Sequence, residues 1–163
     1  MDQKRILLVD DHQLILDGLR GFIQSNPAYV IVGEANNGIQ AIKLAEVLQP
    51  DVILMDIEMP EMSGIQSCQE IKQKLPSVKI VIISMHHEKQ LIKKLIELGA
   101  DGYLLKNSQQ TEVMEAIEKV LRNQSYFSQD VTLSLLDKSS GKNPVSNSTS
   151  HVLAELTERE IEI

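Results

Sequence analysis

Residues 50–64 read PDVILMDIEMPEMSG, and this stretch decides the fold. Its apolar run, Val52–Met55, is bounded by proline and glycine and suits a strand buried on both faces of a parallel sheet. Asp56 follows at the carboxyl end of that strand, where open α/β sheets place their ligands. Pro60 and Gly64 keep the next residues irregular, so their backbone carbonyls are not used by a helix. A carboxylate beside such carbonyls suits a hard cation with a phosphoryl group, whereas an ordinary aspartate here would only cap the next turn.

The composition favours one α/β domain with an aliphatic core. The chain has 163 residues, of which 42% are hydrophobic and only 3% aromatic, a length that suits one such domain with a remainder. The net charge of −7 argues against a chain that clamps nucleic acid by itself. The single cysteine, Cys68, excludes an internal disulfide and the common zinc spacings. Since there is also no membrane-length apolar run and no signal-peptide pattern, we expect a cytoplasmic protein.

Apolar strands alternate with amphipathic helices along most of the chain. Strands are expected over residues 4–9, 30–35, 52–55, 78–84 and 102–105, and helices with apolar stripes over 16–23, 41–48, 65–75, 91–98 and 113–121. Asn37 is the expected N-cap of the second helix. This alternation predicts a doubly wound, five-stranded parallel sheet with helices on both faces and the strand order 2-1-3-4-5.

The composition changes towards the end of the chain. Residues 1–127 hold the strands and helices of the predicted domain, whereas residues 128–155 read as a short helix and a flexible linker rich in serine and asparagine. In residues 156–163, Thr157 is followed three positions later by Glu160, which is the capping box of a helix start. Because barely one turn follows, we expect this end to be the start of a second domain.

Polar side chains follow four of the five expected strands. They are Asp10 and Asp11, Asp56, Ser84 and Lys106, and in the predicted strand order they meet at one edge of the sheet. Two carboxylates about 4 Å apart repel by about 4 kcal/mol at an effective dielectric constant of 20, so the cluster needs a divalent cation or protonation. Oxygen ligands favour Mg²⁺, while the ammonium and the hydroxyl can bind a phosphoryl group. Asp56, on the central strand, is the best candidate nucleophile because the chain has no catalytic cysteine or triad.

Each of these residues has an ordinary structural role when taken alone. Asp10 or Asp11 would cap a helix, Ser84 would cap the fourth helix, and Lys106 would be a solvated surface lysine. Their convergence at one sheet edge is what favours a site. The adjacent pair of histidines at 86–87 resembles a metal-binding pair only superficially, because neighbouring side chains diverge and no third ligand is close in sequence.

Residues 5–123 resemble the receiver domain of response regulators in two-component signalling. The resemblance rests on Asp10-Asp11, on the run Asp56-x-x-Met59-Pro60-x-x-x-Gly64, on Ser84 and on Tyr103-x-x-Lys106. The tail resembles the NarL/FixJ class, since Tyr126-Phe127-Ser128 is followed by a linker and by LTERE at 156–160, which is similar to the opening of a LuxR-type helix-turn-helix domain.

The resemblance implies a CheY-like fold and a cycle in which Asp56 accepts a phosphoryl group from the histidine of a sensor kinase. Asp11, Asp56 and the backbone carbonyl of Glu58 would bind Mg²⁺ directly, and Asp10 would bind it through water. The resemblance further implies a transcription regulator, not an enzyme, that switches a DNA-binding domain. We expect residues 1–163 by themselves not to bind DNA or a membrane.

The same resemblance assigns the remaining site residues. Ser84 and Lys106 would hold the phosphoryl oxygens, and Tyr103 would turn inward together with Ser84 as a pair of switch residues. Asn107 departs from the pattern, since many receivers have a proline there after a cis bond, and a cis bond before asparagine costs about 3 kcal/mol. A phosphorylation-dependent homodimer is expected through either the fourth helix, fifth strand and fifth helix or the first and fifth helices.

Two alternative functions stay open at this point. A phosphatase resembling the haloacid dehalogenase class would also use a strand-end aspartate, and Glu58 stands two residues after Asp56, where that class carries its acid. That class lacks an acidic pair on an earlier strand and needs a cap that this chain does not have. The other alternative is a stand-alone signalling module, against which the linker and the helix start argue.

Overall fold

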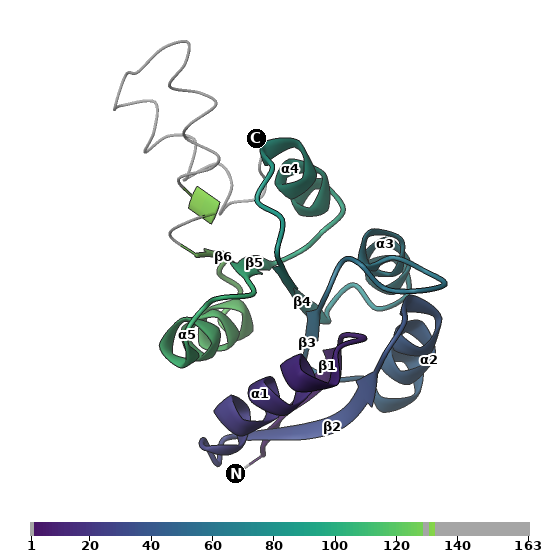
Figure 1. The fold of residues 1–163 in the computed structure, drawn as a ribbon. Helices are drawn as coiled ribbons and strands as arrows, with labels where there is room; N and C mark the ends of the chain where they lie inside the picture. The colour runs from purple at the N-terminus through teal and green to yellow at the C-terminus, as the bar shows by residue number, and fades with distance from the viewer. Residues whose placement is uncertain (1, 129–130, 133–163) are drawn as a thin grey trace.

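The computed structural model describes residues 2–128 and 131–132, which form a parallel sheet covered by helices (Figure 1). The elements are β1 (Lys4–Val9), α1 (Gln13–Gln24), β2 (Tyr29–Ala35), α2 (Gly38–Leu48), β3 (Val52–Met55), α3 (Gly64–Lys74), β4 (Lys79–Ser84), α4 (Lys89–Glu97), β5 (Gly102–Leu105), α5 (Gln110–Leu121) and β6 (Tyr126–Phe127). The predicted alternation is confirmed. Each helix begins one to three residues before its predicted apolar stripe.

The strands lie in the order β2-β1-β3-β4-β5-β6, and every pair is parallel. The predicted order of the first five strands is therefore confirmed. Helices α1 and α5 cover one face of the sheet, and α2, α3 and α4 cover the other (Figure 1). Each face has its own aliphatic core: Leu19 and Ile117 belong to one, Ile71 and Leu95 to the other. The sheet is thus buried on both faces, as the continuous apolar runs predict.

A sixth strand extends the sheet beyond the predicted five. In β6, Tyr126 and Phe127 pair with Gly102 and Tyr103 of β5. Two residues are too few to show the alternation of polar and apolar residues that is typical of a strand. This strand forms because β5 offers a free edge with which it can pair. Val131 is helical and fully buried in the core. The rest of the predicted helix and linker after residue 132, and the predicted start of a second domain, lie outside the described residues.

The central strand β3 fixes where the site forms. Its four residues are buried and lie between β1 and β4, with Met55 in register with Val9 and Ile82. The backbone N–H of Asp56 donates to the carbonyl of Val9 at 2.9 Å, so Asp56 continues the ladder for one further bond. The ends of β1 and β3 are therefore level, and the acidic residues that follow them are neighbours.

The loop after Asp56 folds back closely on its own strand. The backbone N–H of Gly64 donates to the carbonyl of Ile57 at 2.7 Å. A Cβ atom at Gly64 would lie 2.1 Å from the backbone oxygen of Asp56, so only glycine fits here. At the start of α2, the side chain of Asn37 accepts from the backbone N–H of Gln40, which confirms the predicted N-cap. All peptide bonds of the described residues are trans, including the one before Asn107.

Candidate functional site

Asp56 is a buried carboxylate that directly follows the central strand β3. Its side chain is 3% exposed, and its Oδ1 accepts the backbone N–H of Ile57 at 2.8 Å. Within the described residues, Oδ2 accepts no hydrogen bond, although Lys106 Nζ lies 3.2 Å away as an ion-pair partner. Burial and then the charge of Asp10 raise the pKa of Asp56, while Lys106 opposes that shift. The carboxylate therefore has negative charge that its surroundings compensate only in part.

Lys106 bridges the two buried carboxylates of the site. It follows β5, and its backbone N–H donates to the carbonyl of Ser84 at 2.9 Å. Its Nζ lies 3.3 Å from Asp10 Oδ2 and 3.2 Å from Asp56 Oδ2, and the side chain is only 12% exposed. One ammonium thus faces two buried carboxylates. The net negative charge that remains favours the binding of a further cation.

The acidic pair after β1 and Asp56 form the kind of cluster that holds a metal ion. Asp10, Asp11, His12 and Asp56 each offer one ligand atom, and these atoms lie within 4.8 Å of one another. Carboxylate oxygens are the ligands that Mg²⁺ prefers. Asp56 Oδ2 accepts no hydrogen bond from a described residue, and one ammonium is shared by two carboxylates, so both observations fit a bound divalent cation. These residues therefore suit the Mg²⁺ expected from the sequence.

His12 is a member of this cluster that the sequence analysis missed. Its Nδ1 lies 3.0 Å from Asp10 Oδ1 and 3.1 Å from Asp11 Oδ1. Its backbone N–H also donates to Asp10 Oδ1 at 2.9 Å. The only signal in the sequence is that His12 directly follows the acidic pair, and the turn before α1 brings its ring back towards those carboxylates.

Ser84 and Tyr103 lie near the same edge and are both buried. Ser84 ends β4 and is 1% exposed, and its Oγ accepts the backbone N–H of His86 at 3.0 Å. The ring of Tyr103 is 1% exposed, and its hydroxyl donates to the backbone carbonyl of His86 at 2.8 Å. Burial raises the pKa of Tyr103 to about 12. The tyrosine predicted to turn inward therefore already lies inward here.

Glu58 and His86 join two loops at the rim of the site. Glu58 Oε2 and His86 Nε2 are 2.6 Å apart, although Glu58 is largely exposed. The contact raises the pKa of His86, because the negative charge of Glu58 favours the imidazolium. Glu58 comes from the loop after β3 and His86 from the loop after β4. The sequence alone could not show that these two loops meet.

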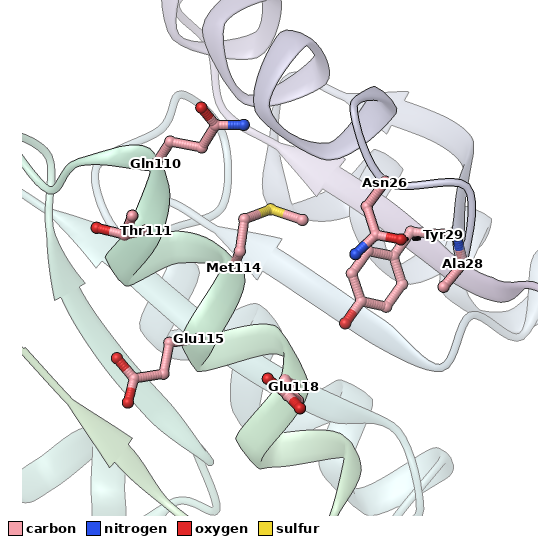
Figure 2. Close-up of a pocket in the computed structure, with 8 residues that line it drawn as sticks. All are labelled: Asn26, Ala28, Tyr29, Gln110, Thr111, Met114, Glu115 and Glu118. Atoms are coloured by element: carbon pink, nitrogen blue, oxygen red, sulfur yellow. Dashed lines mark hydrogen bonds between the residues drawn. The ribbon is translucent and has the colours of Figure 1, made fainter.

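A separate hollow lies on the face covered by α1 and α5 (Figure 2). Its volume is about 630 Å³, and it is lined by Asn26, Ala28, Tyr29, Gln110, Thr111, Met114, Glu115 and Glu118. At its rim the side-chain amide of Gln110 donates to Ser25 Oγ at 3.0 Å and so joins the two helices. None of the strand-edge residues lines this hollow, so it belongs to a different surface.

The doubly wound sheet and its acidic edge, with a lysine after the fifth strand, define a CheY-like receiver fold. Residues 6–118 match the family described as "Response regulator receiver domain". The chain belongs to this family. This membership agrees with the resemblance seen in the sequence, and nothing among the comparisons favours the phosphatase alternative.

Two relatives in the comparisons are named as transcriptional regulatory proteins. The transcriptional regulatory protein YdfI of Bacillus subtilis (strain 168) is 40% identical over 127 residues, which cover 78% of this chain and 59% of YdfI. The transcriptional regulatory protein LiaR of the same strain is 34% identical over 161 residues, which cover 98% of this chain and 74% of LiaR. A LuxR-family two-component response regulator from Aurantimonas sp. SI85-9A1 has a crystal structure that superposes with a TM-score of 0.80 at 33% identity, covering 84% of this chain and 98% of that chain.

Proposed function

We propose that this chain accepts a phosphoryl group on Asp56 from the phosphorylated histidine of a sensor kinase in the cytoplasm. The observation that carries the proposal is the buried Asp56 carboxylate, whose Oδ2 has Lys106 Nζ at 3.2 Å as an ion-pair partner and accepts no hydrogen bond within the described part of the chain. Such an oxygen is held in place and is free to form a new bond. Attack on phosphorus would break the bond to the donor nitrogen and leave a neutral imidazole.

The neighbouring side chains would stabilise the transferring group. Lys106 and Ser84 lie at the same edge and would bind phosphoryl oxygens, one through its positive charge and the other through its hydroxyl. Asp10, Asp11, Asp56 and the backbone carbonyl of Glu58 would hold Mg²⁺, with Asp10 bound through water. The bound ion would neutralise charge on the phosphoryl oxygens during transfer.

Mass spectrometry after treatment with acetyl phosphate and Mg²⁺ tests this proposal. A single added phosphoryl group on Asp56, absent in Asp56→Asn and in the presence of a chelator, is the expected result. Labelling of the variant at the wild-type rate, or labelling unaffected by the chelator, would refute it. Continuous turnover of phosphate esters would instead favour a phosphatase.

We further propose that phosphorylation controls a DNA-binding domain that follows residue 155. The support is the LTERE stretch at 156–160 together with relatives named as transcriptional regulators. The chain spans only 59% of the length of YdfI. Because residues 1–163 carry a net charge of −7, they should show no specific affinity for promoter-like duplexes, and a chain extended by the helix-turn-helix should bind them.

A homodimer that forms on phosphorylation is part of the same proposal. The face of α1 and α5 offers the hollow of Figure 2, and the face of α4, β5 and α5 lies next to the buried Tyr103. Sedimentation of Glu118→Lys and Lys93→Glu variants, with and without beryllofluoride, distinguishes the two faces. Glu118 lines the hollow and Lys93 belongs to α4, so the charge-reversed variant that stays monomeric identifies the interface.

A further inference from the structure

We propose that His12 is a nitrogen ligand of the cation at the strand edge, and that it raises the affinity of this site for late first-row divalent ions relative to Mg²⁺. The inference rests on the proposed function, because it concerns the same cation. It adds a ligand of a different chemical class to a set of oxygens. Co²⁺, Ni²⁺ and Zn²⁺ are the ions that gain most from such a ligand.

The spacing of the donor atoms supports this assignment. Adjacent ligands of an octahedral ion with bonds of about 2.1 Å are about 3.0 Å apart. His12 Nδ1 lies 3.0 Å from Asp10 Oδ1 and 3.1 Å from Asp11 Oδ1. His12 Nδ1 is therefore as far from each of the two carboxylate oxygens as one ligand of such an ion is from its neighbour.

The position of His12 in the fold is not explained by helix capping. His12 is the N-cap residue of α1, yet its side chain makes no capping hydrogen bond. Serine, aspartate or asparagine would serve that position better. The ring instead turns back towards the carboxylates of the acidic pair.

A separate observation is that a single ammonium, that of Lys106, serves both buried carboxylates of the cluster. The Oδ2 atom of Asp56 is buried without a hydrogen bond from any described residue, and Lys106 is the shared ion-pair partner of Asp10 and Asp56. A buried carboxylate in this state favours a bound cation. The four possible ligand atoms of the cluster, one of them from His12, lie within 4.8 Å of one another.

The chemistry of the ligand set gives the expected selectivity. Mg²⁺ prefers oxygen ligands and keeps several waters, so it gains little from an imidazole. Affinity for nitrogen ligands rises from Mn²⁺ through Co²⁺ and Ni²⁺. A site of carboxylates plus His12 should therefore bind Mg²⁺ through the oxygens alone and Co²⁺ through the oxygens and the nitrogen.

Calorimetric titration of the whole chain with Mg²⁺ and with Co²⁺ tests the proposal. His12→Ala should weaken Co²⁺ binding by about tenfold and leave Mg²⁺ binding nearly unchanged. His12→Asn should show the same loss of Co²⁺ preference while keeping a good N-cap, so a folding defect cannot explain the result. His87→Ala is the matched control, since it removes another exposed histidine of the same loop edge and should leave both affinities unchanged.

Paramagnetic NMR of the Co²⁺-loaded chain gives a second readout. A strongly shifted imidazole N–H signal should be present in the wild type and in His87→Ala and absent in His12→Ala. Equal losses of Mg²⁺ and Co²⁺ affinity, or no shifted imidazole signal in the wild type, would overturn the role of His12 and leave the proposed Mg²⁺ site intact. Failure of the wild type to bind either ion would overturn the proposed cation site together with this inference.

Discussion

The hydroxyl of Tyr103 donates a hydrogen bond of 2.8 Å to the backbone carbonyl of His86. The backbone N–H of His86 in turn donates to Ser84 Oγ at 3.0 Å, and its ring contacts Glu58. One residue thus links the buried tyrosine, the strand-end serine and the loop that follows Asp56. A movement of Ser84 towards a phosphoryl group would be transmitted to Tyr103 through His86, because the backbone N–H of His86 donates to Ser84 and its backbone carbonyl accepts from Tyr103.

Tyr103→Phe should remove the hydrogen bond to the His86 carbonyl without leaving a cavity in the core. The ring stays, so the expected cost in the free energy of unfolding is only about 1 kcal/mol, the net value of one hydrogen bond. Urea denaturation measures that cost. In NMR spectra, beryllofluoride should shift the α4 and β5 signals of the wild type much more than those of the variant.

Equal shifts in both proteins would contradict the coupling, since the signal would then reach this face without the hydroxyl. Ser84→Ala is the companion variant, because it removes the other end of the link. It should reduce the same shifts while leaving Tyr103 buried.

Asp56→Asn should raise the free energy of unfolding at neutral pH. Burial and the charge of Asp10 raise the pKa of Asp56 above its ordinary value, so the folded chain holds the proton more tightly than the unfolded chain does. An acid with a raised pKa lowers stability as the pH rises from its unfolded pKa through its folded pKa. The advantage of asparagine should therefore be smallest near pH 4 and grow towards pH 7.

Chemical denaturation at several pH values between about 4 and 7 measures this trend. Adding Mg²⁺ at neutral pH should reduce the difference in the free energy of unfolding between Asp56→Asn and the wild type, because a bound cation stabilises the folded wild type. An advantage that is constant with pH would show that the asparagine acts through packing and not through the charge.

Replacing both Glu58 and His86 with alanine should change the lifetime of phosphorylated Asp56 and leave phosphorylation itself possible. The pair stands at the rim of the site, where water must approach the phosphoryl group. Dephosphorylation after removal of the donor, followed by mass spectrometry, measures the lifetime. His87→Ala, next in sequence and exposed, is the control and should behave like the wild type.

The contribution of this pair should depend on pH. The contact with Glu58 raises the pKa of His86 above its ordinary value. A histidine with a raised pKa keeps its favourable contact below the unfolded pKa and loses it as the pH rises through the folded pKa. The difference in rate between the wild type and Glu58→Gln should therefore be larger at about pH 6 than at about pH 9. A difference that does not vary with pH would mean that the ion pair is not involved.

Much of this architecture can be predicted because four of the five longer strands, β1, β3, β4 and β5, each hold a continuous apolar run that ends at a polar residue. The strand order then brings Asp10, Asp56, Ser84 and Lys106 to one edge, as the structure shows. The contacts between loops could not be predicted in this way. Glu58 and His86 are 28 positions apart, and nothing in either segment specifies that they meet.

Two further features depend on tertiary structure alone. Strand β6 has only two residues, so its pairing is decided by the edge of β5 and not by a pattern. The ring of His12 turns towards the carboxylates only because of the turn that precedes α1. Side chains of adjacent residues usually point in different directions, but His12 and the neighbouring Asp11 are an exception because their side chains are in contact.

Gly64→Ala should damage the site through the backbone, whereas Gly21→Ala should not. A Cβ atom at Gly64 would lie 2.1 Å from the backbone oxygen of Asp56, so the loop that carries Glu58 must move away from β3. We expect a loss of about 2 kcal/mol in the free energy of unfolding, typical of forced overpacking. Phosphorylation of Asp56 should slow as well, because the loop would no longer present the carbonyl of Glu58.

Gly21 is the matched control because it lies within α1 and a Cβ atom there would have no neighbour within 4 Å. Alanine is the better helix former, so Gly21→Ala should raise stability by up to about 1 kcal/mol. Thermal unfolding and acetyl phosphate labelling of both variants test whether the alanine at position 64 damages the site. If Gly64→Ala kept wild-type stability and labelling, the close approach of this loop to β3 would not be needed to form the site.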